Sequence, residues 1–363
     1  MSAMLTCAGC LRAKRSSHMQ RWRLLSSSAA SLRRQVLLMD DIQLAKHDLA
    51  KLKQSYDVLS LESRDRQEFL EDCRSKYNKV EALYRHFKGP ATKVTGLFDA
   101  ELIDGLPAAL KFICHNGAGY DQIDVATCTK RHIQVSNVPT VVDGATADTA
   151  LFLMIGALRQ FGLAQVNLRR GKFNAGLALS HDPKGKVVGI LGMGGIGRAF
   201  AARCRALGVK DVLYHNRSRL SPELEQGAKY VSKQELLETS DVLSLNLPLN
   251  SSTKHSIGES EFKMMKNSAI LVNTARGPIV DEQALIKALE GGEIAGCGLD
   301  VFEHEPSVPD ELLKSEKAFL LPHVGTLTVE TQRDMESFCL DNIEHGMQHG
   351  KLRITVPEQK GEF

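Results

Sequence analysis

Three short segments in the C-terminal half of this 363-residue chain carry side chains that could act on a small anion. Each segment follows an apolar or β-branched run that predicts a strand, so we expect all three at the carboxyl edge of one sheet, where ligand crevices open. Arginine can bind a carboxylate through two hydrogen bonds, histidine can transfer a proton, and a carboxylate can orient the imidazole. The residues in these positions are Arg276 in NTARG, Glu305 in DVFEHEP and His323 in PHVGT.

A GxGxxG pattern directly follows the apolar run KVVGIL and opens a predicted helix. In such a loop the first glycine permits a tight turn, the second lets the backbone approach a pyrophosphate, and the third lets helix and strand pack closely. Free amides and the helix dipole favour the bound anion. This context favours a dinucleotide site over a purely structural turn, formed by Gly192, Met193, Gly194, Gly195, Ile196 and Gly197.

The end of the next predicted strand distinguishes between the two nicotinamide dinucleotides. A carboxylate there would accept a hydrogen bond from the ribose 2′-hydroxyl, whereas an arginine would bind a 2′-phosphate. The chain has no acid at this point and reads Asn216, Arg217, Ser218, Arg219. Because these side chains can make charge-assisted bonds to a phosphate, we predict NADP(H) in preference to NAD(H). The alternative interpretation is that the arginines are solvated loop charges.

A nicotinamide beside Arg276 and His323 would complete the groups that reduction of a 2-oxo acid requires. The carboxylate needs a cation, the forming alkoxide needs a proton donor, and the carbonyl carbon needs a hydride source. The eight cysteines suggest no metal site, since only Cys7 and Cys10 form a CxxC and no second pair accompanies it. The other six are expected to be reduced thiols.

Short β-branched runs alternate with amphipathic stretches from residue 35 onward, which predicts an α/β fold. We expect two Rossmann-like or flavodoxin-like domains, each a doubly wound parallel sheet, with a cleft between them. Predicted strands span residues 36–39, 57–61, 94–97, 110–115, 133–135, 187–191, 212–215, 242–246, 269–274 and 296–301. Predicted helices span residues 63–87, 150–159, 196–207, 282–290 and 328–347, and Thr146 is expected to cap the second of these.

The last predicted helix follows the second unit but could return to the first one. The expected division is therefore a discontinuous substrate-binding domain of residues 36–143 plus 327–355 and an NAD(P)-binding Rossmann domain of residues 144–326.

Residues 1–35 differ in composition from the rest of the chain. They hold seven basic side chains, no acid and many serines, although the whole chain has a net charge of only +3. This composition favours a mitochondrial transit peptide over a disordered basic tail of a cytoplasmic protein. The remaining chain is mildly acidic, which argues against nucleic-acid binding, and no apolar run reaches the length that a membrane helix requires.

These motifs, in this order, resemble the D-isomer-specific 2-hydroxyacid dehydrogenase family, nearest its glyoxylate/hydroxypyruvate reductase-like members. The resemblance covers nearly all of the chain after the first 35 residues. It implies that Arg276 binds and polarises the substrate, that His323 is the general acid or base, and that Glu305 orients the imidazole. It also implies that backbone amides of Ala118 and Gly119, in NGAGYD, hold the substrate carboxylate. The remaining cofactor contacts that it implies are Leu247, Pro248, Thr253, Thr274, Ala275, Asp300, His323 and Gly325.

The expected reaction is NADPH-dependent reduction of glyoxylate or hydroxypyruvate to the D-2-hydroxy acid. Two alternatives stay open at this point. Relatives that act on aromatic 2-oxo acids, of the D-mandelate dehydrogenase type, look similar in these motifs. Some members of the superfamily are dinucleotide-sensing corepressors that bind peptides instead of turning over a metabolite. The resemblance also implies a homodimer formed through the cofactor domain.

Overall fold

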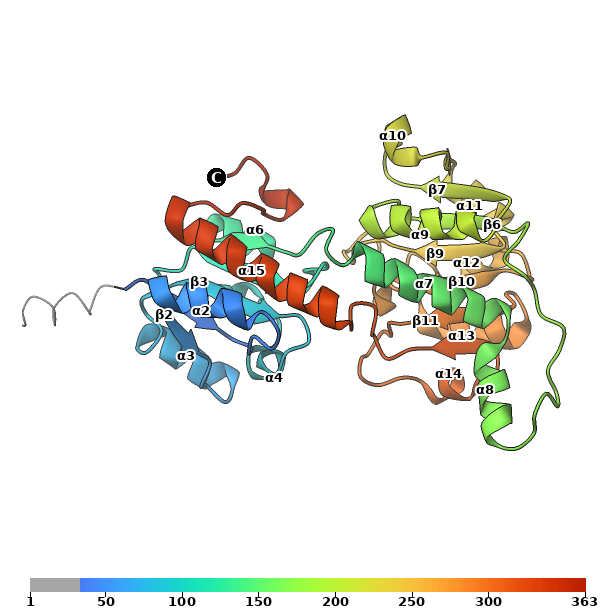
Figure 1. The fold of residues 1–363 in the computed structure, drawn as a ribbon, viewed down its shortest axis with the longest axis horizontal. Helices are drawn as coiled ribbons and strands as arrows, with labels where there is room; N and C mark the ends of the chain where they lie inside the picture. The colour runs from blue at the N-terminus through green and yellow to red at the C-terminus, as the bar shows by residue number, and fades with distance from the viewer. Residues whose placement is uncertain (1–32) are drawn as a thin grey trace, which may run out of the picture.

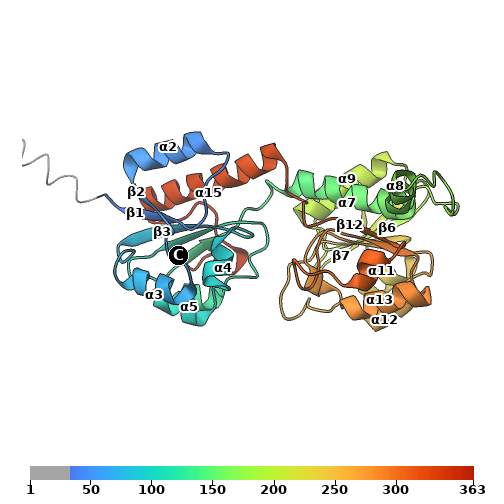
Figure 2. The ribbon, with the colours of Figure 1, turned by 90° about the horizontal axis from the view of Figure 1, so that it is seen from below.

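The computed structural model describes residues 33–363, and the predicted transit peptide lies almost wholly outside them. The described chain forms two lobes, each a parallel sheet with helices on both faces (Figures 1 and 2). The predicted α/β class with two doubly wound sheets is therefore confirmed.

The first lobe contains five strands in the order β2-β1-β3-β4-β5, all parallel. Helices α2 and α15 cover one face of this sheet and α3, α4, α5 and α6 cover the other (Figure 2). The strands are β1 Gln35–Leu38, β2 Asp57–Ser60, β3 Val80–His86, β4 Phe112–Asn116 and β5 Gln134–Ser136. The helices are α2 Lys46–Ser55, α3 Arg66–Arg74, α4 Ala91–Thr95, α5 Ala100–Gly105, α6 Val125–Lys130 and α15 Val329–His349.

The second lobe contains seven parallel strands in the order β12-β11-β10-β9-β6-β7-β8. The order reverses between β6 and β9, which is the point where doubly wound sheets bind ligands. The strands are β6 Val187–Leu191, β7 Asp211–His215, β8 Lys229–Tyr230, β9 Val242–Leu245, β10 Ile270–Asn273, β11 Gly296–Leu299 and β12 Ala318–Leu320. The helices are α7 Asp143–Leu158, α8 Phe161–Arg169, α9 Gly195–Ala206, α10 Pro222–Glu225, α11 Lys233–Thr239, α12 Glu259–Met264, α13 Glu282–Gly291 and α14 Asp310–Lys314.

The chain passes between the lobes twice, once after β5 and once after β12. The second passage brings α15 back onto the first sheet, beside α2 (Figure 1). The carboxylate of Glu336 on α15 accepts hydrogen bonds of 2.8, 2.7 and 2.8 Å from the amides of Gln43, Leu44 and Ala45, just before α2. This buried carboxylate satisfies amides that precede the helix, which holds the returning segment in place.

Two predicted elements and one predicted helix cap were wrong. No strand forms at residues 94–97: residues 94 and 95 are the end of helix α4, and the following Gly96 has a φ of 65°, which stops the helix. The helix expected at residues 63–87 ends at Arg74, and β3 follows it. Strand β3 is buried on both faces and lacks the alternation that marks a strand, so its apolar residues resembled a helical face.

Thr146 does not cap a helix. Helix α7 begins at Asp143, earlier than predicted, so Thr146 lies inside its first turns and is buried. The six cysteines of the described chain are free and buried, in agreement with the predicted reduced thiols. Among residues 33–363 no single helix is both long and apolar enough to cross a membrane; α7 and α8 meet such a test only when joined across a 71° bend.

Candidate active site

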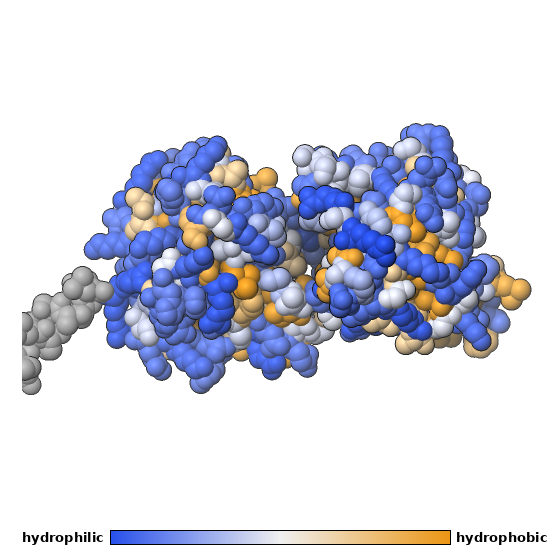
Figure 3. All heavy atoms as spheres, turned by 90° about the horizontal axis from the view of Figure 1, so that it is seen from above, coloured by the Kyte–Doolittle hydropathy of each residue, from blue (hydrophilic) through white to orange (hydrophobic). Residues whose placement is uncertain are grey.

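A cavity of about 260 Å³ lies between the two lobes. The space-filling view shows the hollow between them (Figure 3). The first lobe contributes Phe87, directly after β3, and the loop after β4, and the second contributes the segments after β9, β10, β11 and β12. The carboxyl ends of strands in both sheets therefore face one space, as expected for a ligand site in folds of this kind.

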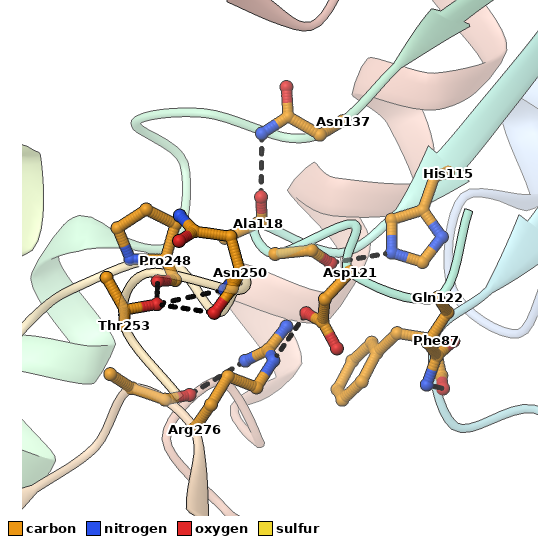
Figure 4. Close-up of polar contacts among 12 residues, drawn as sticks. Phe87, His115, Ala118, Asp121, Gln122, Asn137, Pro248, Asn250, Thr253 and Arg276 are labelled. Carbon is orange, nitrogen blue, oxygen red and sulfur yellow. Dashed lines mark hydrogen bonds and ion pairs between the residues drawn. The ribbon is translucent and has the colours of Figure 1, made fainter. Parts of the chain in front are cut away.

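Arg276 enters this cavity from the loop after β10. Its Nε donates a hydrogen bond of 2.8 Å to Oδ1 of Asp121 in the first lobe, and its Nη1 donates one of 2.8 Å to the carbonyl of Ala275 (Figure 4). A Cβ atom added to Gly119 would lie only 2.1 Å from Nη2 of Arg276, so the guanidinium fits against the loop after β4 because that position lacks a side chain.

His323 enters the cavity from the turn after β12. Its Nδ1 lies 3.0 and 2.8 Å from the two carboxylate oxygens of Glu305. The backbone φ of His323 is 56°, a left-handed conformation that residues with a side chain rarely adopt. Such strain clusters at functional sites, where the surrounding structure imposes it. The carboxylate fixes a proton on Nδ1, so Nε2 is the atom left to exchange a proton with a substrate.

Glu305 is held in its ionised form. Burial by itself raises the pKa of this carboxyl, but the hydrogen bond and charge of His323, the amide of Phe302 and the charge of Lys88 outweigh burial and lower the pKa to about 2. Lys88 belongs to the first lobe, and its Nζ lies 3.2 Å from Oε2 of Glu305. The Glu305–His323 pair of the second lobe is therefore joined by an ion pair to the first lobe across the cleft.

Asp300 shapes the turn that carries His323. Its two carboxylate oxygens accept hydrogen bonds of 2.7 and 2.8 Å from the amides of Val324 and Gly325. Burial raises the pKa of Asp300, although these two amides and the charge of His323 oppose the shift. Because the carboxylate accepts from both residues that follow His323, it helps to impose the strained backbone there.

The glycine loop has the close approaches that its sequence predicts. Gly192 has a φ of 99°, and a Cβ there would lie 2.6 Å from the carbonyl oxygen of Asn246; a Cβ on Gly197 would lie 2.5 Å from the carbonyl oxygen of Gly192. Gly194 has nothing within 4 Å of such an atom, so its outer side is open to a ligand. Helix α9 begins directly after it, at Gly195.

The residues after β7 divide into two groups. The side-chain oxygen of Asn216 accepts a hydrogen bond of 2.7 Å from the amide of Met193, which ties this strand end to the glycine loop. Arg219 is occupied by Glu225, with bonds of 2.8 and 3.1 Å. Arg217 and Ser218 are exposed, and within residues 33–363 no ion pair or side-chain hydrogen bond involves Arg217. Arg217 is therefore the charge that remains available to a phosphate.

The cavity residues that follow β9 and β10 fit a nicotinamide dinucleotide. The side-chain oxygens Oγ1 of Thr274 and Oδ1 of Asn246 are buried and have no hydrogen-bond partner in the described chain. Both residues line the cavity, and the backbone of Asn246 lies against Gly192 of the glycine loop. Buried polar atoms are rarely left without partners, so each of these two oxygens is left to form a hydrogen bond with a bound ligand. Residues 33–363 contain no group of three His, Cys, Asp or Glu side chains placed to bind a metal ion.

Most of the predicted site residues meet in this cavity, and some do not. The predicted residues that line it are Ala118, Gly119, Ile196, Leu247, Pro248, Thr274, Ala275, Arg276, Asp300, His323 and Gly325. Glu305 does not line the cavity but contacts His323, which does. Thr253 does not line the cavity, because its hydroxyl donates to the carbonyl of Pro248 at 2.6 Å and braces that loop instead (Figure 4). The rest of the glycine loop, with Asn216, Arg217 and Ser218, lies outside the cavity lining.

Sequence reasoning missed several residues of the lining. Asp121 is the last residue of the NGAGYD motif, so its carboxylate could have been predicted as a site residue from the sequence. Phe87 and Met335 gave no such signal, because Phe87 follows the unpredicted strand β3 and Met335 lies on the returning helix α15. The missed residues are Phe87, Gly117, Asp121, Val142, Thr146, Asn246, Leu249, Thr326 and Met335.

A glycine loop at the switch point of a parallel sheet, beside a cleft with an arginine and a carboxylate-bound histidine, defines a nicotinamide-dependent oxidoreductase. The comparisons with known proteins agree. The sequence profile of the D-isomer specific 2-hydroxyacid dehydrogenase NAD binding domain matches residues 151–325. The 4-methyl-2-oxopentanoate reductase A of Aspergillus oryzae is 51% identical over 328 residues, which cover 90% of this chain and 99% of the relative.

Two solved structures have the same fold throughout. A glyoxylate reductase from Paecilomyes thermophila is 50% identical with a TM-score of 0.87, and the match covers 90% of this chain and 99% of that one. The holo form of Rhodotorula graminis D-mandelate dehydrogenase is 30% identical with a TM-score of 0.85, covering 90% and 98%. The chain belongs to the D-isomer-specific 2-hydroxyacid dehydrogenase family. It is an oxidoreductase that reduces 2-oxo acids with a nicotinamide dinucleotide.

Proposed function

We propose that this enzyme reduces a small 2-oxo acid, glyoxylate or hydroxypyruvate, to the D-2-hydroxy acid with NADPH. The observation that carries the proposal is that Arg276 and His323 enter one small cavity from two strand ends, and each is held by a carboxylate. We assign residues 36–143 plus 327–355 to substrate binding and residues 144–326 to cofactor binding.

The side chains of the cleft divide the reaction between them. Arg276 and the amides of Ala118 and Gly119 bind the carboxylate of the substrate, and the guanidinium polarises the keto oxygen. The reduced nicotinamide, when bound, supplies the hydride. His323 gives the proton on Nε2 to the forming alkoxide, and Glu305 stabilises the imidazolium from the other side of the ring. In the reverse direction neutral His323 accepts that proton.

The cofactor would be held by the glycine loop and by the residues that follow β9, β10 and β11. Thr274 and Asp300 would contact the nicotinamide end of the cofactor, together with Ala275, Leu247, Pro248 and Gly325. The free guanidinium of Arg217, with Ser218, supports NADPH as the preferred form because a 2′-phosphate would gain a charge-assisted bond there.

The size of the cavity supports a small substrate. A volume of about 260 Å³ is modest for a site that must also admit a nicotinamide ring. Similarity favours the same choice, since the glyoxylate reductase is 50% identical and the D-mandelate dehydrogenase is 30% identical. The branched 4-methyl-2-oxopentanoate is the second candidate, because the reductase of that name is 51% identical.

The test is NADPH oxidation with glyoxylate, hydroxypyruvate, 4-methyl-2-oxopentanoate and phenylglyoxylate. We expect kcat/KM to be highest for the first two. Arg276→Ala and His323→Ala should each lower kcat/KM by roughly 10²-fold or more. His349→Ala, which removes an exposed imidazole at the end of α15, is the matched control and should leave turnover unchanged. No turnover with any acid would favour a peptide-binding, dinucleotide-sensing protein instead.

We propose that the enzyme is a homodimer through its cofactor lobe. Several large apolar side chains on α8 and the loop after it are exposed, with Phe173 72% and Leu179 99% accessible. An exposed apolar surface of this kind is typical of an interface. Sizing chromatography with light scattering tests this, and Leu168→Asp, on the same surface, should shift a dimer toward monomer.

We propose a mitochondrial location from the basic, acid-poor residues 1–35. Expression of the full chain with a C-terminal fluorescent tag should give mitochondrial fluorescence and a shortened N-terminus. A cytosolic protein with an intact N-terminus would contradict this.

A further inference from the structure

The loop after β4 has three consecutive carbonyl groups, and each of them forms a hydrogen bond to another residue of the first lobe. The carbonyl of Gly117 accepts a hydrogen bond of 2.9 Å from the amide of Val138. The carbonyl of Ala118 accepts one of 2.7 Å from the side-chain amide of Asn137 (Figure 4). The carbonyl of Gly119 lies 2.9 Å from Nε2 of His115. Three different partners therefore fix three successive peptide units.

The amides of these same peptide units are free. A trans peptide unit is planar, and its N–H points away from its C=O, so fixing the three carbonyls fixes the directions of the amides of Ala118, Gly119 and Tyr120. None of the three donates a hydrogen bond to another described residue. The loop lines the cavity next to Arg276. Successive free amides beside a guanidinium form a site for an anion.

A buried cation stands behind this loop. Arg85 is only 2% exposed and has no carboxylate within ion-pair distance in the described chain. Its Nη1 lies 2.9 Å from Nδ1 of His115, its Nη2 donates to Gln122 at 2.8 Å, and its guanidinium lies 4.8 Å from the centre of the Phe98 ring. Burial lowers the pKa of Arg85 to about 10, so the cation persists at neutral pH.

Arg85 selects the tautomer of His115. Arginine can only donate hydrogen bonds, so Nδ1 of His115 must accept, and the ring proton is on Nε2, where it is donated to the carbonyl of Gly119. Burial and the neighbouring charge of Arg85 lower the pKa of His115 well below its usual value, which keeps the ring neutral. The buried cation thus acts on the loop through one imidazole.

We infer that Arg85, His115 and Asn137 are positioning residues that hold the amides of the loop after β4 toward the carboxylate of the 2-oxo acid. A buried, unpaired guanidinium is costly for the fold. The guanidinium lies behind the loop with the His115 imidazole between them, where it orients the loop and adds positive potential at the place where the substrate carboxylate would bind. The inference rests on the proposed function of this cleft.

The experiment compares a substrate acid with its neutral amide. Purified His115→Leu, Arg85→Met and Asn137→Ala variants are assayed with NADPH and glyoxylate or 4-methyl-2-oxopentanoate, and with the corresponding 2-oxo amides. We expect the KM for the acids to rise roughly tenfold or more, the factor for a lost charge-assisted interaction, with smaller changes in kcat and in the KM for the amides. His115→Gln, which keeps a donor, should recover part of the loss.

Binding of oxalate to the NADP-loaded protein, measured by calorimetry, gives a readout independent of turnover. It should weaken in parallel with the KM for the acids. Arg131→Met is the matched control. This arginine donates to the carbonyls of Leu106 and Pro107, away from the cavity. Its loss should lower Tm but should not change the ratio of the KM for the acid to the KM for the amide.

Equal losses for acid and amide, or unchanged oxalate binding in a folded variant, would overturn the inference. If a buried substitution prevents folding, Asn137→Ala at its half-buried position still decides the matter. A failure of the proposed function looks different, because the wild-type protein would then turn over no 2-oxo acid, while oxalate binding would still report on these residues.

Discussion

Both carboxylate oxygens of Glu305 lie within hydrogen-bond distance of Nδ1 of His323, at 3.0 and 2.8 Å. Lys88 approaches the same carboxylate from the first lobe. The ionised form of Glu305 therefore contributes both to the orientation of the His323 ring and to the contact between the lobes.

The first prediction concerns stability in acid. The pKa of Glu305 falls from 4.5 to about 2 on folding, so its contribution is complete above pH 4.5 and is lost as the pH falls toward 2. Glu305→Gln should flatten the pH dependence of the free energy of unfolding in this window by on the order of 2 kcal/mol. Urea denaturation at pH 5, 4 and 3 measures it. The exposed Glu316→Gln is the control, and an equal change there would contradict the prediction.

Gly119→Ala should disable the site without unfolding the protein. The added Cβ would lie 2.1 Å from Nη2 of Arg276 and must displace the guanidinium. We expect kcat/KM to fall about 100-fold, since small misplacements of a positioning group cost that much. Gly291→Ala, where the added atom meets nothing within 4 Å, should have normal kinetics. Normal kinetics in Gly119→Ala would show that Arg276 does not need this approach.

Arg217→Ala should raise the KM for NADPH roughly tenfold or more and leave the KM for NADH nearly unchanged, because only NADPH carries the 2′-phosphate. Arg219→Ala is the matched control, since Glu225 already occupies that guanidinium. Initial rates at varied cofactor concentration distinguish the two variants. The assignment fails if the wild-type enzyme prefers NADH at least tenfold, or if both substitutions have the same effect.

Phe87→Ala should widen the substrate range. The Phe87 ring lines the cavity and lies 5.5 Å, centre to centre, from the imidazole of His323. Removing it gives room beside the reacting carbonyl, so kcat/KM for phenylglyoxylate relative to glyoxylate should rise about tenfold. Phe152→Ala, on an exposed face of α7, should not alter this ratio. An unchanged ratio in Phe87→Ala would place the substrate side chain elsewhere.

Much of the second lobe could be predicted from sequence because its signals are local. Strand β6 spans the predicted residues, and helix α9 begins within one residue of its predicted start. A glycine loop needs its strand and helix directly beside it, so pattern and structure coincide. The first lobe was harder to predict because β3, buried on both faces and carrying Arg85, shows neither alternation nor a continuous apolar run.

By itself, the sequence determined the chemistry: the types and order of Arg276, Glu305 and His323, the glycine loop, and the missing acid after β7. These depend on residue identity and short spacing, which a linear chain displays directly. Only the tertiary structure decided which groups surround them. Asp121 and Lys88 pair with residues of the other lobe, and Arg85 contacts His115 on the neighbouring strand. These partners are far apart in the chain, and they meet only when the strands pair and the two lobes pack together.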